Sequence, residues 1–173
     1  MQQPAPLEEV AAYMRAHDLL LVTGESCTAG LIAARLADVP GAGALLDCAF
    51  VTYSPESKRR CLQVDPDTME RFNLTSEAVA RQMAIGALAH SGANVAVANT
   101  GVADSTDPDV PSGTQCYAWA FRDARGVMHL FSATCRFGGD RNAIREASAD
   151  YALGCIPYYH QLFAASLRST HDG

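Results

Sequence analysis

Thr23-Gly24-Glu25-Ser26-Cys27-Thr28-Ala29-Gly30 sets the architecture of this chain. The apolar run Leu19 to Val22 before it predicts a buried strand, and the spacing of Leu31 to Leu36 after it predicts a helix. Small residues therefore carry a strand directly into a helix, as in an α/β unit. A helix N-terminus presents unpaired backbone N–H groups and a partial positive charge, which suit an oxyanion or a phosphate. Ser26 is then either a nucleophile at this turn or an ordinary N-cap.

The rest of the chain continues the alternation of helices and strands. Turn signals and apolar spacing predict helices from Leu7 to His17-Asp18, from Ser54-Pro55 through Leu62, and from Glu77 to His90, the last capped by Thr75 or Ser76. They predict strands from about Leu46 to Tyr53 and from Val95 to Ala98, and a hairpin of Thr114 to Phe121 and Val127 to Phe137. A turn is expected at Asp65-Pro66-Asp67, and a final helix from Asp140 that Pro157 kinks or restarts. We therefore expect one α/β domain over residues 1–173, with a mixed, mostly parallel β-sheet flanked by helices and a late β-hairpin. Residues 169–173 are expected to be frayed.

Composition excludes several classes of protein. With 173 residues, of which 49% are hydrophobic, the chain can bury a real core. Its net charge of −6 argues against a nucleic-acid-binding surface. Its apolar runs stay well short of the ~20 residues that span a bilayer. Met1 to Leu7 has neither the basic flank nor the apolar core of a secretory signal, so we expect a cytoplasmic location.

The six cysteines and five histidines are dispersed along the sequence. The cysteines form no C-x-x-C pair, which favours free, mostly buried thiols in a reducing compartment. The histidines show no metal-binding spacing, so we expect no metal site.

Lys58 is the only lysine, and the other fixed cations are all arginine. An ammonium can lose its proton when it is partly buried, whereas a guanidinium stays charged. The sequence thus leaves two interpretations: a general base, or a chance lysine on a solvated helix face. Lys58 and Tyr53 follow the strand next to the one that precedes Ser26. Because the carboxyl ends of neighbouring strands share one crevice, these three side chains are expected to lie within reach of each other, with Lys58 accepting the serine proton and Tyr53 relaying it or holding the amine.

Arg141 and Arg145 lie at i and i+4 near the start of the last helix. They could face solvent, pair with Glu146 and Asp150, or clamp an anionic substrate, because the planar guanidinium matches phosphate.

Taken together, these motifs resemble those of the CinA C-terminal domain, the nicotinamide-nucleotide amidohydrolase (PncC) family. The resemblance rests on Glu25-Ser26-Cys27-Thr28-Ala29-Gly30, Val39-Pro40-Gly41, Val51-Thr52-Tyr53-Ser54 with Lys58, Thr100-Gly101, and Gly139-Asp140-Arg141 with Ile144-Arg145. It covers nearly the whole chain, which is expected to be the stand-alone form of this family.

The resemblance implies deamidation of nicotinamide mononucleotide to nicotinate mononucleotide and ammonia, with no cofactor and in a homo-oligomer. It implies that Ser26 is the nucleophile, Lys58 the general base and Tyr53 its partner. It further implies that the start of the following helix, at Cys27, Thr28 and Gly30, supplies backbone donors. Two later segments are implied to line the substrate site: Thr100 with Gly101, and Arg141 with Arg145.

One segment departs from the family pattern. The glycine-rich continuation after Thr100-Gly101 is replaced by residues 102–112, which contain Asp104, Asp107 and Asp109. If this loop touches a phosphate, its negative charge weakens binding of an anionic nucleotide. Two alternative functions follow: a catalytically silent nucleotide-binding paralogue, or a hydrolase of a different, less anionic amide or ester. Cys27 is an alternative nucleophile, although no histidine lies nearby in the sequence to act as its base.

Overall fold

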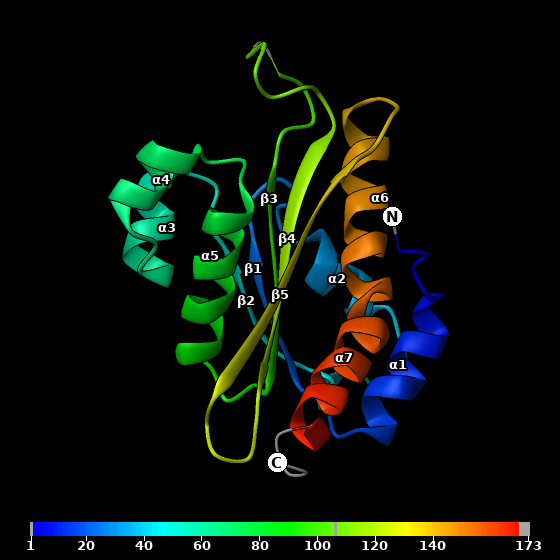
Figure 1. Ribbon diagram of the computed structural model, residues 1–173. Helices are drawn as coiled ribbons and strands as arrows, with labels where there is room; N and C mark the ends of the chain where they lie inside the picture. The colour runs from blue at the N-terminus through cyan, green and yellow to red at the C-terminus, as the bar shows by residue number, and fades with distance from the viewer. Residues whose placement is uncertain (1, 106, 170–173) are drawn as a thin grey trace.

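A five-stranded mixed sheet forms the centre of the protein, for which a computed structural model describes residues 2–105 and 107–169 (Figure 1). The strand order is β2-β1-β3-β4-β5. β1 pairs in parallel with both β2 and β3, whereas β4 pairs antiparallel with β3 and β5, so β4 alone runs against the other four strands. The strands are β1 (Leu21–Glu25), β2 (Leu46–Val51), β3 (Val95–Gly101), β4 (Thr114–Arg122) and β5 (Met128–Arg136).

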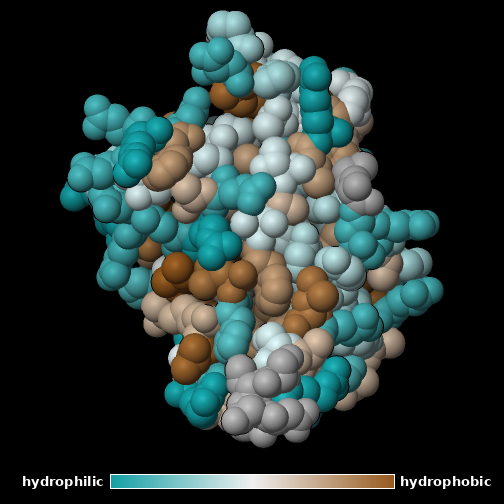
Figure 2. Space-filling model, in the orientation of Figure 1, coloured by the Kyte–Doolittle hydropathy of each residue, from teal (hydrophilic) through white to brown (hydrophobic). Residues whose placement is uncertain are grey.

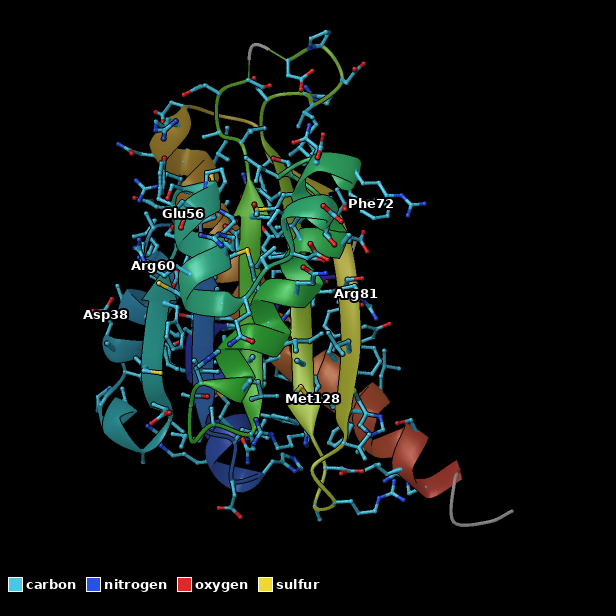
Figure 3. The ribbon with its side chains drawn as sticks, turned by 90° about the vertical axis from the view of Figure 1, so that its left-hand side faces the viewer. Asp38, Glu56, Arg60, Phe72, Arg81 and Met128 are labelled. Atoms are coloured by element: carbon cyan, nitrogen blue, oxygen red, sulfur yellow. The ribbon has the colours of Figure 1, made fainter. Side chains whose placement is uncertain are left out.

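Helices cover both faces of this sheet. One face carries α1 (Leu7–Ala16), α2 (Leu31–Ala37), α6 (Arg141–Gly154) and α7 (Ile156–Ser169), and the other carries α3 (Pro55–Leu62), α4 (Pro66–Phe72) and α5 (Glu77–Ala89). A short 3-10 helix, η1 (Ala42–Ala44), precedes β2. The second group of helices stands in front of the sheet in Figure 3, with Glu56 on α3 and Phe72 at the end of α4.

The two faces are packed with side chains of different size, because alternate residues of a strand point to opposite faces. On β4, Tyr117, Trp119 and Phe121 point to the side of α6 and α7, where they join the larger aromatic core. The intervening Ala118 and Ala120 face α5, so that this helix packs directly against β3 and β4.

Several predictions from the sequence are confirmed. The fold is α/β with a mixed sheet, and the late hairpin is β4–β5. Ser54 caps α3 through a reciprocal pair of hydrogen bonds with Ser57, and Ser76 caps α5. Pro157 restarts the last helical region, since α6 ends at Gly154 and α7 begins at Ile156.

Other predictions were wrong in detail. Asp65-Pro66-Asp67 is not an isolated turn, because the Asp65 side chain accepts the Asp67 N–H and caps α4. β1 extends to Glu25, so Thr23–Glu25 belong to the strand. The fraying expected for residues 169–173 stays a prediction, because Ser169 ends α7 and residues 170–173 lie outside the described part of the chain.

The six cysteines are free thiols, as expected, and four of them are buried. A hydrophobic area lies over α5 and the edge strand β5 in Figure 2, where Met128 and Leu130 are partly buried and Ile85 is exposed. Among the described residues, no helix is both long and apolar enough to cross a membrane.

Candidate active site

A cavity of about 270 Å³ opens where the parallel strands β1, β2 and β3 end. Its volume is close to the lower end of the range for small-molecule sites. It lies at the carboxyl edge of the sheet, where open α/β sheets bind their ligands. The cavity is lined by Ser26, Cys27, Tyr53, Lys58, Asn73, Leu74, Thr75, Thr100, Gly101, Val102, Ala103, Asp104 and Arg141.

Ser26 and Lys58 form the chemical centre of this cavity. The Nζ atom of Lys58 lies 2.9 Å from the Oγ atom of Ser26 and 2.8 Å from the backbone oxygen of Thr52. Lys58 is 1% exposed and Ser26 is 8% exposed. The structure therefore brings the sole lysine to the serine, and the interpretation of Lys58 as a residue on a solvated helix face is excluded.

Local structure accounts for the position and the chemistry of Lys58. Capping by Ser54 and the first-turn Pro55 start α3 directly after β2, so Lys58 falls on its second turn, one turn before the buried Leu62. Burial disfavours the ammonium form and lowers the pKa of Lys58 to about 8. A measurable fraction of the amine is therefore neutral, and able to accept a proton, near neutral pH.

Asn99 on β3, which pairs with Glu25 in the sheet, holds the turn that carries Ser26. The Ser26 N–H donates to the Asn99 backbone oxygen at 3.0 Å, and the Thr28 N–H donates to Asn99 Oδ1 at 3.2 Å. Between them, the Cys27 N–H has no acceptor among the described residues. Ser26 is not the N-cap of α2, which begins after Gly30 with a left-handed φ of 94°. The Ser26 hydroxyl is thus available for chemistry rather than used as a cap.

Glu25 is the residue at this site that the sequence analysis missed. Its carboxylate is 0% exposed and accepts five hydrogen bonds, from the hydroxyls of Thr23 and Thr28 and from the backbone N–H groups of Gly30, Ile32 and Ala33. The expectation that the helix start at Cys27-Thr28 supplies donors to the substrate therefore needs correction. The helix begins at Leu31, and its N-terminal N–H groups are occupied by Glu25. An acid at the end of a buried strand just before a helix start could have signalled this role.

A buried polar network supports the turn from below. Asn99 Nδ2 donates to Gln115 Oε1 at 3.0 Å, and the Ser148 hydroxyl donates to the same oxygen at 3.2 Å. Gln115 Nε2 in turn donates to Val102 O and contacts the Cys27 sulfur at 3.3 Å. Because buried polar groups are costly unless they are satisfied, this network holds β3, β4 and α6 in one arrangement around the site.

Tyr53 and Arg141 lie at the exposed rim of the cavity. Tyr53 is 59% exposed, and its hydroxyl accepts a hydrogen bond from Arg141 Nη2 at 2.8 Å. Arg141 Nη1 lies 3.3 Å from Asp104 Oδ2. In the described structure Tyr53 therefore contacts Arg141 rather than Lys58, and the acceptor that holds the amine is the backbone oxygen of Thr52.

Arg145 lies beside the cavity but does not line it. Its guanidinium donates to the backbone oxygens of Cys27 and Thr28, at 3.0 and 3.1 Å. Glu146 and Asp150, which could have paired with the arginines of α6, pair with Arg35 on α2. Like Thr28 and Gly30, Arg145 therefore shapes the turn from behind the cavity wall.

Thr100 and Gly101 line the cavity from the end of β3. The Thr100 hydroxyl donates to Leu74 O at 2.8 Å, which draws residues 73–75 into the cavity wall. The sequence analysis marked only Thr75 in this segment, as a possible helix cap. Gly101 is required by close packing, since a Cβ atom there would lie 2.5 Å from Gln115 Oε1.

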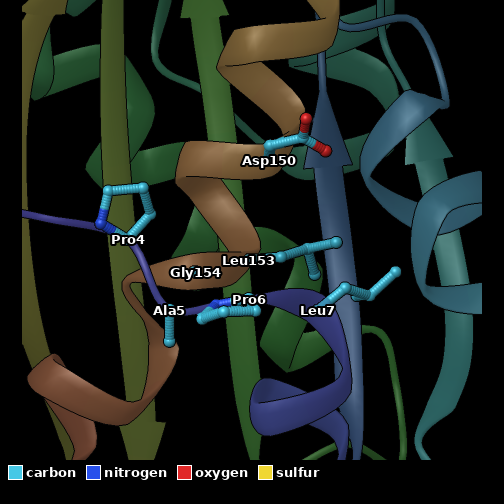
Figure 4. Close-up of a pocket in the computed structure, with 7 residues that line it drawn as sticks. All are labelled: Pro4, Ala5, Pro6, Leu7, Asp150, Leu153 and Gly154. Atoms are coloured by element: carbon cyan, nitrogen blue, oxygen red, sulfur yellow. The ribbon is translucent and has the colours of Figure 1, made fainter.

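A second cavity lies where the N-terminal segment crosses α6, and the residues that line it are drawn in Figure 4. Its one titratable side chain is Asp150, which pairs with Arg35. Within the described residues, no group of three or more His, Cys, Asp or Glu side chains could hold a metal ion.

Fold and site together define an α/β domain whose cavity, at the carboxyl edge of its parallel strands, is built around a buried serine–lysine pair. The chain belongs to the CinA C-terminal domain family, whose family model matches residues 5–159.

Comparison with known proteins gives the same family. The chain is 37% identical over 147 residues to a protein of Enterobacter agglomerans named nicotinamide-nucleotide amidohydrolase PncC, covering 84% of this chain and 87% of that protein. It is 40% identical over 154 residues to a CinA-like protein of Akkermansia muciniphila, covering 86% of this chain. It spans only 36% of that relative's length.

Solved structures of the family share the fold. A CinA superfamily protein of Klebsiella pneumoniae 700603 superposes with a TM-score of 0.81 at 34% identity, covering 88% of this chain and 93% of that one. The competence/damage-inducible protein CihA of Agrobacterium tumefaciens gives a TM-score of 0.78 at 35% identity, covering 94% and 98%.

Proposed function

We propose that the protein is an amidohydrolase that deamidates nicotinamide mononucleotide to nicotinate mononucleotide and ammonia through Ser26 and Lys58. The observation that carries this proposal is the 2.9 Å contact between Lys58 Nζ and Ser26 Oγ, in surroundings where the lysine is 1% exposed. The relative named PncC supports the substrate class. Tyr53, which contacts Arg141, is assigned to the rim of the site rather than to proton transfer.

The chemistry follows from the two side chains. Neutral Lys58 takes the Ser26 proton while Oγ bonds to the amide carbon, and the carbonyl electrons move onto oxygen. When the tetrahedral adduct collapses, the C–N bond breaks and the Lys58 ammonium gives the proton to the leaving nitrogen, which departs as ammonia. A solvent water, deprotonated by the same amine, then cleaves the ester and restores Ser26. The backbone oxygen of Thr52 holds the amine in position throughout.

The Cys27 N–H is the proposed donor to the developing oxyanion. It is adjacent to the nucleophile and has no acceptor among the described residues, whereas the N–H groups of Ser26 and Thr28 on either side are held by Asn99. One well-placed donor of this kind contributes roughly 3 kcal/mol to transition-state stabilisation.

Release of ammonia from nicotinamide mononucleotide tests the proposal. Wild-type turnover should be lost in Ser26→Ala and in Lys58→Arg, because a guanidinium does not give up its proton. Arg60→Met is the matched control, since Arg60 is an exposed cation on the same helix, and it should keep wild-type activity. Full activity in Lys58→Arg would end the assignment of the base. Inactivation of Ser26→Ala by iodoacetamide, if that variant were still active, would favour Cys27 as the nucleophile.

A second candidate function is binding of a pyridine nucleotide without turnover. The replacement of the glycine-rich family segment by residues 102–112 motivates it, because Val102, Ala103 and Asp104 of this loop line the cavity. Measurable affinity for nicotinamide mononucleotide without ammonia release would select this alternative. The homo-oligomer expected from the sequence stays a prediction, which sedimentation of the intact chain would test.

A further inference from the structure

Three charged side chains line the cavity among the described residues: Lys58, Asp104 and Arg141. Lys58 is already engaged by the Ser26 hydroxyl and the Thr52 backbone oxygen. Arg145, the other nearby cation, is turned to the backbone oxygens of Cys27 and Thr28. Arg141 is therefore the cation that the cavity can offer to an anionic part of a ligand.

Arg141 already has an anion of its own. Its Nη1 atom lies 3.3 Å from Asp104 Oδ2, and the two side chains are 50% and 72% exposed. An ion pair this exposed adds little to stability and can be broken by a competitor. A phosphate that bound Arg141 would therefore compete with the Asp104 carboxylate for the guanidinium. The negative charge of Asp104 would also repel the phosphate directly.

We propose that Asp104 is a specificity-determining residue that weakens binding of the phosphate group, and so shifts the preference of the site from the nucleotide toward the phosphate-free pyridinium nucleoside. The inference rests on the proposed function, because it takes the pyridinium carboxamide as the ligand. The pyridinium ring carries the same positive charge in the nucleoside and in the nucleotide, so the discrimination depends on the phosphate alone. The nucleotide adds a phosphate of about −1.5 to −2 charge at pH 7, for which the cavity holds one guanidinium that is already paired.

The expected size of the effect follows from Coulomb's law in water. A unit charge that lies about 4 Å from another unit charge changes a binding constant by about five-fold, and a phosphate of about −1.5 charge raises this to about ten-fold. Neutralising Asp104 should therefore shift the preference between nucleotide and nucleoside by about ten-fold. The shift should decrease at high salt, since the pair is exposed.

The experiment compares kcat/KM for nicotinamide mononucleotide with that for nicotinamide riboside, in the wild type and in Asp104→Asn. We expect the ratio to rise about ten-fold in the variant, mostly through a lower KM for the nucleotide. Asp109→Asn is the matched control, because it removes the same charge from the same loop at an exposed position that does not line the cavity. Its ratio should stay within about two-fold of wild type.

A double-mutant cycle with Arg141→Gln identifies the cause. If Asp104 repels the phosphate directly, the effect of Asp104→Asn should stay near ten-fold once the arginine is gone, whereas competition for Arg141 alone would reduce it to about two-fold. A ratio that does not move in Asp104→Asn, or that moves equally in Asp109→Asn, overturns the inference.

Failure of the proposed function gives a different result from failure of this inference. If no variant releases ammonia from either compound, the catalytic proposal fails, and the dissociation constants of the same two compounds, measured by calorimetry, take the place of kcat/KM. A ten-fold shift in their ratio in Asp104→Asn then still supports the role of Asp104, and an unchanged ratio removes it.

Discussion

Lys58 and Thr52 are joined by a hydrogen bond of 2.8 Å from the side-chain nitrogen of the first to the backbone oxygen of the second. Thr52 follows the last residue of β2, and its N–H donates to the backbone oxygen of Glu25 on β1. The acceptor that holds the amine is therefore part of the same backbone that places Ser26, the next residue after Glu25. Because the amine is tied to this backbone, its position relative to Ser26 is set by the sheet.

The first prediction concerns the pH dependence of catalysis. Burial lowers the pKa of Lys58 to about 8, so the neutral, proton-accepting form increases as the pH rises through that value. We expect kcat/KM for nicotinamide mononucleotide to rise between about pH 6.5 and 9 with an apparent pKa near 8. Initial rates of ammonia release across this range check it. A rate that is flat over this interval contradicts a titrating amine as the base.

The second prediction concerns stability against pH. The pKa of Lys58 is about 8 in the folded state and has a reference value of 10.5, so the unfolded chain binds more protons between these values. Stability due to this group therefore increases as the pH rises from about 8 to 10.5 and is lost again as the pH falls. Over the whole window the change is about 3 kcal/mol, from roughly 1.36 kcal/mol per pKa unit.

Lys58→Met is the reference variant for that measurement, because it removes the titrating group and keeps the side chain's bulk. The free energy of unfolding in urea, measured for both proteins at pH 7 and pH 10, should rise in the wild type relative to the variant. A constant difference between the two proteins would mean that the lysine is not desolvated in solution.

The third prediction concerns Glu25. Removing its carboxylate leaves three backbone N–H groups and two hydroxyls without their acceptor. Glu25→Ala should lose about 3 kcal/mol or more of unfolding free energy, since hydrogen bonds to a charged group contribute roughly 1.5–3 kcal/mol each and buried orphans are costly. Glu9→Ala, on the exposed side of α1, is the control and should change stability by less than about 0.5 kcal/mol. Equal stabilities of the two variants would contradict the role of Glu25.

The fourth prediction concerns Tyr53. Its hydroxyl contacts Arg141 and is mostly exposed, so it belongs to the rim of the cavity. Tyr53→Phe should change KM by a few-fold and leave kcat and the apparent pKa of the rate close to wild type. If turnover instead fell by about a hundred-fold or more, the size typical of a proton-transfer group, Tyr53 would be restored as a relay.

The fifth prediction concerns the packing under the site. A methyl group at position 101 would lie 2.5 Å from Gln115 Oε1 and 2.6 Å from the Thr114 backbone oxygen. Gly101→Ala should therefore lose about 1–3 kcal/mol of unfolding free energy, as other overpacked sites do. Gly43→Ala is the control, because a Cβ atom at Gly43 meets nothing within 4 Å, and its melting temperature should match or exceed that of the wild type.

Much of the fold could be predicted because the signals are local. The cap at Ser54, the hairpin turn between Phe121 and Val127 and the restart at Pro157 each depend on a few neighbouring residues. Short elements were missed for the same reason. α4 has no buried residue, so it shows no apolar spacing that would distinguish it from the turn at Asp65-Pro66.

The roles of the polar residues were harder to predict, since most depend on contacts between distant parts of the chain. Arg141 and Arg145 lie one helical turn apart and look equivalent in sequence. One faces the cavity and pairs with Asp104, whereas the other holds the turn at Cys27 from behind. Glu25 was missed for a different reason, since its contacts are local: the predicted strand stopped at Val22, so that Glu25 looked like part of a polar loop.

The α/β class, the strand-to-helix turn that carries Ser26 and the singular position of Lys58 all follow from the amino-acid order, because hydrophobic spacing, turn residues and residue type can be read over short stretches. Two other features needed the folded chain: the burial of Lys58 against Ser26, and the pairing of Asp104 with Arg141 at the cavity rim. Burial and pairing depend on which strand ends meet at one edge of the sheet. That meeting joins residues 32 and 37 positions apart in the sequence, over which no local pattern extends.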